Sequence, residues 1–187
     1  MRYKEYASKV VKEIEQVLSD VDEEEVLSFV DAIAEAQKIQ VFGMGRMGFS
    51  GRAFAMRLKH LGLESYMVWE TVTPAIGEGD LLIVNCGCTK FGEEVAKLAK
   101  KAGAKVALIT AHPDSDIGKL SDVIVRLPAQ VLRGGEGEIP SIQPMASLFE
   151  QTLLILCDIV ALLLMDKLRI TEEDMEKMHT NLDSYMG

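Results

Sequence analysis

The sequence predicts an α/β fold in which helices cover both faces of a parallel sheet, that is, a three-layer α-β-α sandwich. Two observations support this prediction: short apolar runs alternate with amphipathic runs along the chain, and glycine-containing turns separate several of them. Alternating strands and helices build parallel sheets, because each helix carries the chain back across a face of the sheet. With 187 residues, 48% of them hydrophobic, and with no internal repeat or linker, we expect residues 1–187 to form a single domain.

The spacing of apolar residues assigns each run to a strand or a helix. Asp22 and Glu25 resemble a capping box at the start of the second expected helix, and Thr171 and Asp174 resemble another near the C-terminus. The helix after the first glycine cluster is expected to stop at Gly62. The expected strands are 39–42, 65–69, 80–85, 105–110 and 122–127, the expected helices are 6–17, 26–33, 49–62, 93–103, 148–165 and 171–179, and residues 128–144 are expected to form a glycine-rich loop.

Composition and charge exclude several classes of function. The chain has 20 basic and 29 acidic residues and a net charge of −9, which argues against nucleic acid or an anionic membrane surface as its main partner. Three cysteines, an odd number, fit a reducing cytosol better than a disulfide framework. The charged, amphipathic N-terminus has no apolar signal core, so we expect a cytoplasmic protein.

One segment, residues 148–165, is apolar enough to suggest a membrane span. Glu150, Gln151 and Asp158 interrupt it, and its uninterrupted apolar run is shorter than the roughly 20 residues that a span needs. A helix that is apolar on nearly all sides is typical of an element buried between layers or subunits. We therefore expect no membrane partner, and we expect Asp158 to be a buried polar or interface residue.

The segment GMGRMG, residues 43–48, follows an apolar strand and precedes a helix. Gly43, Gly45 and Gly48 have the spacing of a dinucleotide-binding fingerprint, and Glu70 closes the second strand where a ribose-binding acid is expected. The fingerprint alone is a weak signal, because any tight turn between strand and helix favours glycine. Three interpretations stay open on these residues: a dinucleotide site, a sugar-phosphate site and a turn without a ligand.

A second loop, NCGCTKFGEE, follows the third strand at the same edge of the sheet. Gly87 permits a tight turn, and the helix after it presents amide groups and a positive dipole end to an anion. Cys86 and Cys88 have no nearby histidine or third cysteine, so they fall short of a zinc set and we expect no metal. They are interpreted as small buried thiols, and His112 in the next loop, beside a proline, is interpreted as a turn residue.

Glu150 lies about two turns into the long apolar helix. Burial there would raise its pKa toward the range that suits a general base. The alternative is a structural carboxylate paired with an arginine, and the residues by themselves leave both interpretations open.

Four stretches of the sequence resemble the sugar isomerase (SIS) domain family, and within it the group of 6-phospho-3-hexuloisomerases. They are RAFAMRLKHLG (52–62), ETVTPAIGEGDLLI (70–83), SIQPMASLFEQTLL (141–154) and ITEEDMEKMHTNLD (170–183). The resemblance runs from about the first helix to the C-terminus. It implies a five-stranded parallel sheet, a homotetramer, and an interconversion of hex-3-ulose 6-phosphate and fructose 6-phosphate without cofactor or metal. It decides against the dinucleotide site, since the segment 141–151 has no role there.

The resemblance also implies roles for individual residues. Glu150 is the candidate base, and His179 is expected to reach a neighbouring subunit's site and to assist ring opening or proton shuttling. Arg46 is expected to hold the phosphate or to polarise an oxygen, and Gln143 is expected to line the sugar pocket. The expected binding residues for the small phosphosugar are completed by Gly45, Cys86, Gly87, Cys88 and Thr89.

This chain departs from the family pattern around the phosphate. Met47 stands where the family has a serine, and Cys86 to Phe91 replace a serine–glycine–serine loop followed by glycine, acid and threonine. Each lost hydrogen bond to a charged group costs about 1.5–3 kcal/mol, although Thr89 supplies one hydroxyl and Lys90 replaces an acid with a cation. Two hypotheses follow: a phosphosugar isomerase, and a sugar-phosphate binding module with altered or lost catalysis.

Overall fold

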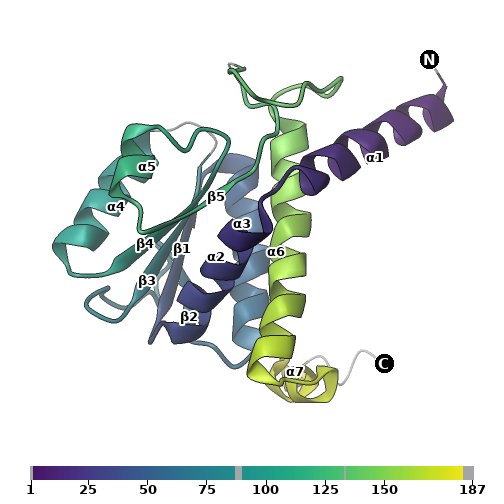
Figure 1. Cartoon of the computed structure of the whole chain (residues 1–187). Coiled ribbons are helices and arrows are strands. Elements are labelled where there is room, and N and C mark those ends of the chain that lie inside the picture. Colours follow the sequence, from purple (N-terminus) through teal and green to yellow (C-terminus); the bar gives the residue numbers. More distant parts are fainter. Residues whose placement is uncertain (1, 87–89, 133, 183–187) are drawn as a thin grey trace.

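A five-stranded, all-parallel sheet forms the middle layer of the computed structural model, which describes residues 2–86, 90–132 and 134–182 (Figure 1). The strands are β1 (Ile39–Gly43), β2 (Ser65–Met67), β3 (Leu81–Asn85), β4 (Lys105–Thr110) and β5 (Val123–Arg126), in the order β2-β1-β3-β4-β5. The direction of winding reverses between β1 and β3. In open sheets of this kind, ligands bind at such a switch point, outside the carboxyl ends of the strands.

Helices cover both faces of the sheet, which confirms the three-layer α/β fold (Figure 1). Strand residues alternate between two apolar cores: Leu81 and Ile83 contribute to the core under α2, α3 and α6, and Leu82 and Val84 to the core under α4 and α5. Both cores are apolar, so the strands read as continuous apolar runs. The helices are α1 (Tyr3–Ser19), α2 (Glu23–Glu35), α3 (Gly45–His60), α4 (Lys90–Lys101), α5 (Asp116–Leu120), α6 (Ser147–Leu168) and α7 (Glu172–Met178).

Local features differ from the expectation in four places. Asp22 caps α2 by accepting hydrogen bonds from the amides of Glu24 and Glu25, but the Glu25 carboxylate accepts from the amide of Arg126 at 2.7 Å instead of closing a capping box. Strand β2 ends two residues before the expected boundary, and α4 begins three residues earlier. Helix α5 was not expected, because so short a helix shows no clear periodicity. The capping box expected at the start of α7 is confirmed.

Helix α6 is long and apolar enough, by length and composition, to cross a membrane. Half of its most apolar window is buried in the fold, as in the core helix of a globular domain, so this finding is weak evidence for a span. Of the two expectations for Asp158, burial is wrong within the single chain, where its side chain is exposed and lines a cavity beside α7, and a place at an interface stays a prediction. Asp158 lies on the exposed face of α6, one turn before the exposed Leu162.

Candidate functional site

The chain turns from β1 into α3 at the switch point, through the glycine motif. Gly45, the first residue of α3, has φ +58°, a left-handed conformation that favours glycine. A Cβ atom on Gly48 would lie 2.6 Å from the carbonyl oxygen of Gly43, so glycine allows the helix to approach the strand. Backbone geometry accounts for these glycines without a ligand, and it places Arg46 at the carboxyl edge of the sheet.

Arg46 and Glu150 form an ion pair where the N-terminal ends of α3 and α6 meet. Nη1 of Arg46 lies 2.9 Å from Oε2 of Glu150 and donates a hydrogen bond of 3.1 Å to Oγ of Ser147. The Arg46 side chain is 56% exposed, whereas that of Glu150 is 13% exposed. The pair therefore combines a cation that a solute can reach with a carboxylate that is largely withdrawn from water.

Burial and the arginine act on the pKa of Glu150 in opposite directions. Burial raises the pKa of Glu150 above its usual value, and the Arg46 guanidinium lowers it by a smaller amount. Oε2 of Glu150 is buried and has no aligned hydrogen bond that would hold the charged form. Both interpretations of the sequence therefore apply: Glu150 is paired with an arginine, and its pKa is shifted in the direction that suits a general base.

Two residues in the left-handed conformation lead into α6. Met145 has φ 58° and Ala146 has φ 63°, and neither is glycine. For such residues this conformation costs roughly 1–2 kcal/mol each, and backbone strain of this kind is found at functional sites. The amide and the hydroxyl of Ser147 both donate to the carbonyl oxygen of Pro144, at 3.1 and 2.7 Å. Glu150 lies in the first turn of α6 and not about two turns into the helix as expected, so this turn orients it toward Arg46.

Gln143 belongs to a hydrogen-bond network that connects α1 with α6. Oε2 of Glu13 accepts from Oγ of Ser141 at 2.7 Å and from Nε2 of Gln143 at 3.4 Å. Oε1 of Glu13 accepts from the amide of Ile142 at 2.9 Å, and Oε1 of Gln143 accepts from Nε2 of Gln151 at 2.8 Å. The network fixes residues 141–143 against the helix that carries the ion pair.

The side chains at the end of β3 lie on opposite faces of the sheet. Cys86 is 2% exposed and belongs to the apolar core on the α4 side, so the expectation of a buried thiol is confirmed for it. Asn85 lies on the side that α3 covers, with Nδ2 3.3 Å from the position of a Cβ atom on Gly51. A binding role for Cys86 stays a prediction. Gly87, Cys88 and Thr89 lie outside the described residues.

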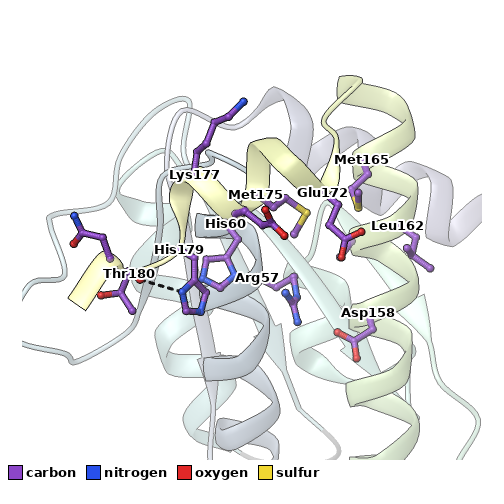
Figure 2. A pocket seen from close by; sticks show the side chains of 13 residues that line it. Arg57, His60, Asp158, Leu162, Met165, Glu172, Met175, Lys177, His179 and Thr180 are labelled. Atoms are coloured by element: carbon purple, nitrogen blue, oxygen red, sulfur yellow. Dashed lines mark hydrogen bonds between the residues drawn. The ribbon is translucent and has the colours of Figure 1, made fainter. Parts of the chain in front are cut away.

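His179 lies at the opposite end of α3 and α6 from the ion pair (Figure 2). It follows α7, and the centroid of its ring is 5.1 Å from that of His60, the last residue of α3. Nδ1 of His179 lies 3.2 Å from the carbonyl oxygen of Thr180. Arg46 and His60 are roughly 20 Å apart along α3, at a rise of 1.5 Å per residue. Within one chain, the structure does not bring His179 to Glu150.

A cavity of about 890 Å³ opens beside His179, between α3, α6 and α7 (Figure 2). The pKa of His60 is lowered there, mainly by burial and then by Arg57 and His179. The lining includes the apolar side chains Ala161, Leu162, Met165 and Met175 and the charged side chains Arg57, Asp158, Glu172, Glu176 and Lys177. Arg46 and Glu150 do not line it, so it is separate from the site at the carboxyl edge.

Ion pairs account for two other residues that the sequence singles out. Oε1 of Glu70, the acid of the dinucleotide interpretation, lies 3.2 Å from Nε of Arg52. Nε2 of His112, which the sequence suggests to be a turn residue, lies 2.9 Å from Oε1 of Glu138. In the described part of the chain, no group of three or more His, Cys, Asp or Glu side chains is arranged to hold a metal ion.

Sequence reasoning did not single out three residues that support the site. Oγ of Ser50 lies 3.5 Å from the carbonyl oxygen of Arg46 and 3.4 Å from that of Glu150, and so joins α3 to α6. Ser147 lies inside the motif SIQPMASLFEQ, which could have indicated it. Glu13 shows no local signal, because all of its partners are far away in the sequence.

This chain is similar to known proteins over most of its length. The family model described as "SIS domain" matches residues 32–155. A protein of Bacillus subtilis (strain 168) named 3-hexulose-6-phosphate isomerase is 38% identical over 98% of this chain and 100% of its own length. A protein of the same name from Mycobacterium gastri is 37% identical over 94% of this chain and 89% of its own length. A solved structure from Methanococcus jannaschii, for which the function of 3-hexulose-6-phosphate isomerase was inferred, has a TM-score of 0.82 at 34% identity and covers 95% of this chain and 99% of its own.

Proposed function

Because this chain belongs to the SIS domain family, we propose that it is a sugar-phosphate isomerase that interconverts hex-3-ulose 6-phosphate and fructose 6-phosphate. The observation that carries the proposal is the ion pair of Arg46 and Glu150 at the carboxyl edge of the sheet. The similarity to proteins named for this reaction extends over nearly the whole chain. This extent favours catalysis over a binding module.

The reaction moves a carbonyl group between two neighbouring carbon atoms. In the direction of fructose 6-phosphate, one proton moves from C2 to C3 and one from O2 to O3, through an enediol. We assign the removal of the carbon-bound proton to Glu150, whose raised pKa makes it a stronger base than an ordinary carboxylate. Arg46, next to the carboxylate, stabilises the developing oxyanion or holds the phosphate.

The other proposed substrate contacts surround the same edge. Gln143 lines the sugar pocket, held in place by its hydrogen bonds to Glu13 and Gln151. The start of α3 at Gly45 presents amide groups to an anion. The phosphate is expected to bind near Gly87, Cys88 and Thr89, through backbone amides and a threonine hydroxyl. Cys86, whose thiol is packed on the α4 side, is expected to contribute less than the residues after it.

A second copy of the chain is proposed to complete the site, in a homotetramer or at least a dimer. Helix α1 projects from the body of the fold (Figure 1), and its apolar side chains Tyr3, Tyr6 and Val11 are 85%, 50% and 62% exposed. On α6, Leu162 is 62% exposed. Apolar surface of this kind is typical of contacts between subunits. Such an assembly also gives His179 a route to the ion pair of a neighbouring copy.

We further propose that the enzyme is cytoplasmic and takes a small phosphosugar as its partner. Support comes from the cysteines: Cys86 and Cys157 are both buried, as expected of small thiols that pack in a core in a reducing compartment. Burial strongly raises the pKa of Cys157, so this thiol is unreactive.

The test is the conversion of fructose 6-phosphate by the purified chain, followed by ¹³C NMR in deuterium oxide. We expect the 3-ulose phosphate to appear, and solvent deuterium to enter at C3 of fructose 6-phosphate because the base exchanges its proton. Glu150→Gln is the matched control, since it keeps the shape of the side chain without the basic carboxylate. Neither conversion nor exchange in the wild-type protein would contradict the proposal.

A further inference from the structure

Asn85, the last residue of β3, has a buried carboxamide without a hydrogen-bond partner. The residue is 1% exposed, and in the described structure neither Nδ2 nor Oδ1 makes a hydrogen bond. Buried amide groups in folded proteins are nearly always paired, and an exception calls for an explanation. Here both the donor and the acceptor of one side chain are unpaired, which indicates a polar partner that the described residues do not supply.

The place of Asn85 in the fold favours a ligand as that partner. It lies at the carboxyl end of β3, in register with Gly43 at the end of β1, so it belongs to the switch point of the sheet. Its amide lies on the side of α3, against Gly51. The residue before Gly51 is Ser50, whose hydroxyl lies 3.4 Å from the carbonyl oxygen of Glu150. The unpaired amide thus faces α3 one residue along the chain from the serine that joins α3 to α6.

Buried polar atoms without an aligned hydrogen bond are concentrated at this edge. Among the described residues, four of six such atoms belong to Asn85, Glu150 and Gln151. The other two are on Asp80, at the amino end of β3, and on Glu138, which pairs with a histidine. Unsatisfied polar groups of a folded protein that gather in one place are typical of a site made for a polar ligand.

We propose that Asn85 is a substrate-binding residue, whose carboxamide pairs with oxygen atoms of the sugar chain. This inference rests on the proposed isomerase function. A carboxamide donates through Nδ2 and accepts through Oδ1, and the carbonyl and hydroxyl groups on C2 and C3 of the ketose supply one acceptor and one donor. The amide has no charge, so it binds the substrate and the enediol without competing with Glu150 for the proton.

The test compares catalysis with stability in Asn85→Leu, which keeps the number of side-chain heavy atoms and the branching at Cγ and has no polar atoms. We expect kcat/KM to fall about tenfold or more, as for the loss of a good hydrogen bond to substrate. The melting temperature should stay the same or rise, because the variant removes unpaired polar atoms from the free protein. A residue with a purely structural role would not lose activity while gaining stability.

Thr152→Val is the matched control. Thr152, in α6, is buried like Asn85, but its hydroxyl is already paired with the carbonyl oxygens of Leu148 and Phe149. We expect this variant to keep kcat/KM. A folded Asn85→Leu protein with kcat/KM within twofold of the wild type would overturn the proposal and leave an internal water as the partner. Should the leucine variant not fold, Asn85→Ala is measured in the same way, with the same two outcomes.

A calorimetric titration with fructose 6-phosphate separates this inference from the proposed function. If the wild-type chain binds fructose 6-phosphate without converting it, the proposed function fails. The role of Asn85 then stands if Asn85→Leu weakens that binding about tenfold or more. Equal binding by the two proteins, or no binding by the wild type, overturns it.

Discussion

The two ends of the α3–α6 helix pair carry different chemistry, although the same two helices form both. At one end Arg46 and Glu150 form an ion pair of 2.9 Å. At the other end the rings of His60 and His179 lie 5.1 Å apart, beside Arg57. Helix N-termini favour carboxylates and C-termini favour cations, so the dipoles of the helices suit the position of Glu150 at the first end and of Arg57 at the second.

Within one chain, the candidate base Glu150 and the candidate histidine His179 therefore lie at opposite ends of the helix pair. Arg46 and His60 mark the two ends of α3, and they are roughly 20 Å apart because a helix rises 1.5 Å per residue. If Glu150 and His179 both act in one site, the two residues come from different copies.

The largest effect is expected when subunits with defects at opposite ends are mixed. Glu150→Gln alone should lower kcat about 10²–10⁴-fold, the usual contribution of a general base, and His179→Ala should also lower it. Dimers formed at random from the two variants should regain about a quarter of the wild-type sites, because half of the dimers are mixed and each has one intact site. Turnover of fructose 6-phosphate after co-expression measures this.

The matched control mixes Glu150→Gln with Arg46→Met, since both of these changes lie at the same end of the helix pair. Every site in such a dimer keeps one defect, so no activity should return. Recovery only with the histidine variant means that the two ends meet across subunits. No recovery with either would show that His179 serves the site of its own chain or no site.

The next effect concerns the pH dependence of the end with the ion pair. The Arg46 guanidinium lowers the pKa of Glu150, whereas burial raises it by more. In Arg46→Met the pKa should rise further, and since the base works as a carboxylate, the acid limb of kcat/KM should move to higher pH. Arg52→Met, a change of an arginine that is 51% exposed on the same helix, should leave the limb in place. An unmoved limb in Arg46→Met would exclude Glu150 as the titrating group.

A smaller effect is expected at the histidine end, on stability. Burial, Arg57 and His179 hold the pKa of His60 below its usual 6.5. As the pH drops below 6.5, His60 binds a proton in the unfolded chain before it does so in the folded chain. The free energy of unfolding therefore falls between pH 6.5 and the lower pKa of His60 in the folded chain. The melting temperature of His60→Gln should fall less between pH 7 and pH 5 than that of the wild type. The decrease for Arg57→Gln should lie between the two. Parallel curves for all three proteins would contradict this.

The smallest effect concerns the turn that orients the end with the ion pair. Ala146 has φ 63°, so Ala146→Gly should raise the free energy of unfolding, by up to about 1 kcal/mol. Ala161→Gly, the same change inside α6, should lower it by about 1 kcal/mol. Urea unfolding measures both. Destabilisation by both changes would mean that the left-handed turn is not strained.

Most of the fold could be predicted from local patterns, because buried positions in helices and strands are occupied by apolar residues at a regular spacing. The apolar run at 80–85 becomes β3, and the glycine at 45 marks the left-handed start of α3. The candidate site was predicted only in part. Glu150 could be singled out as a carboxylate in an apolar helix, but two interpretations stayed open until its partner was known. Glu13 and Ser50 had no local signal at all.

Local sequence patterns were enough for the five strands, all helices except α5, the α/β fold and the family to which the chain belongs, because these depend on short-range periodicity and on motifs that stay together along the chain. The contacts between side chains that are far apart in the sequence could be known only from the tertiary structure. Arg46 contacts Glu150, Glu13 holds residues 141–143, and His179 ends beside His60. Such contacts depend on how α3 and α6 pack on the sheet. A local sequence pattern does not indicate which residues, distant along the chain, come close together in space.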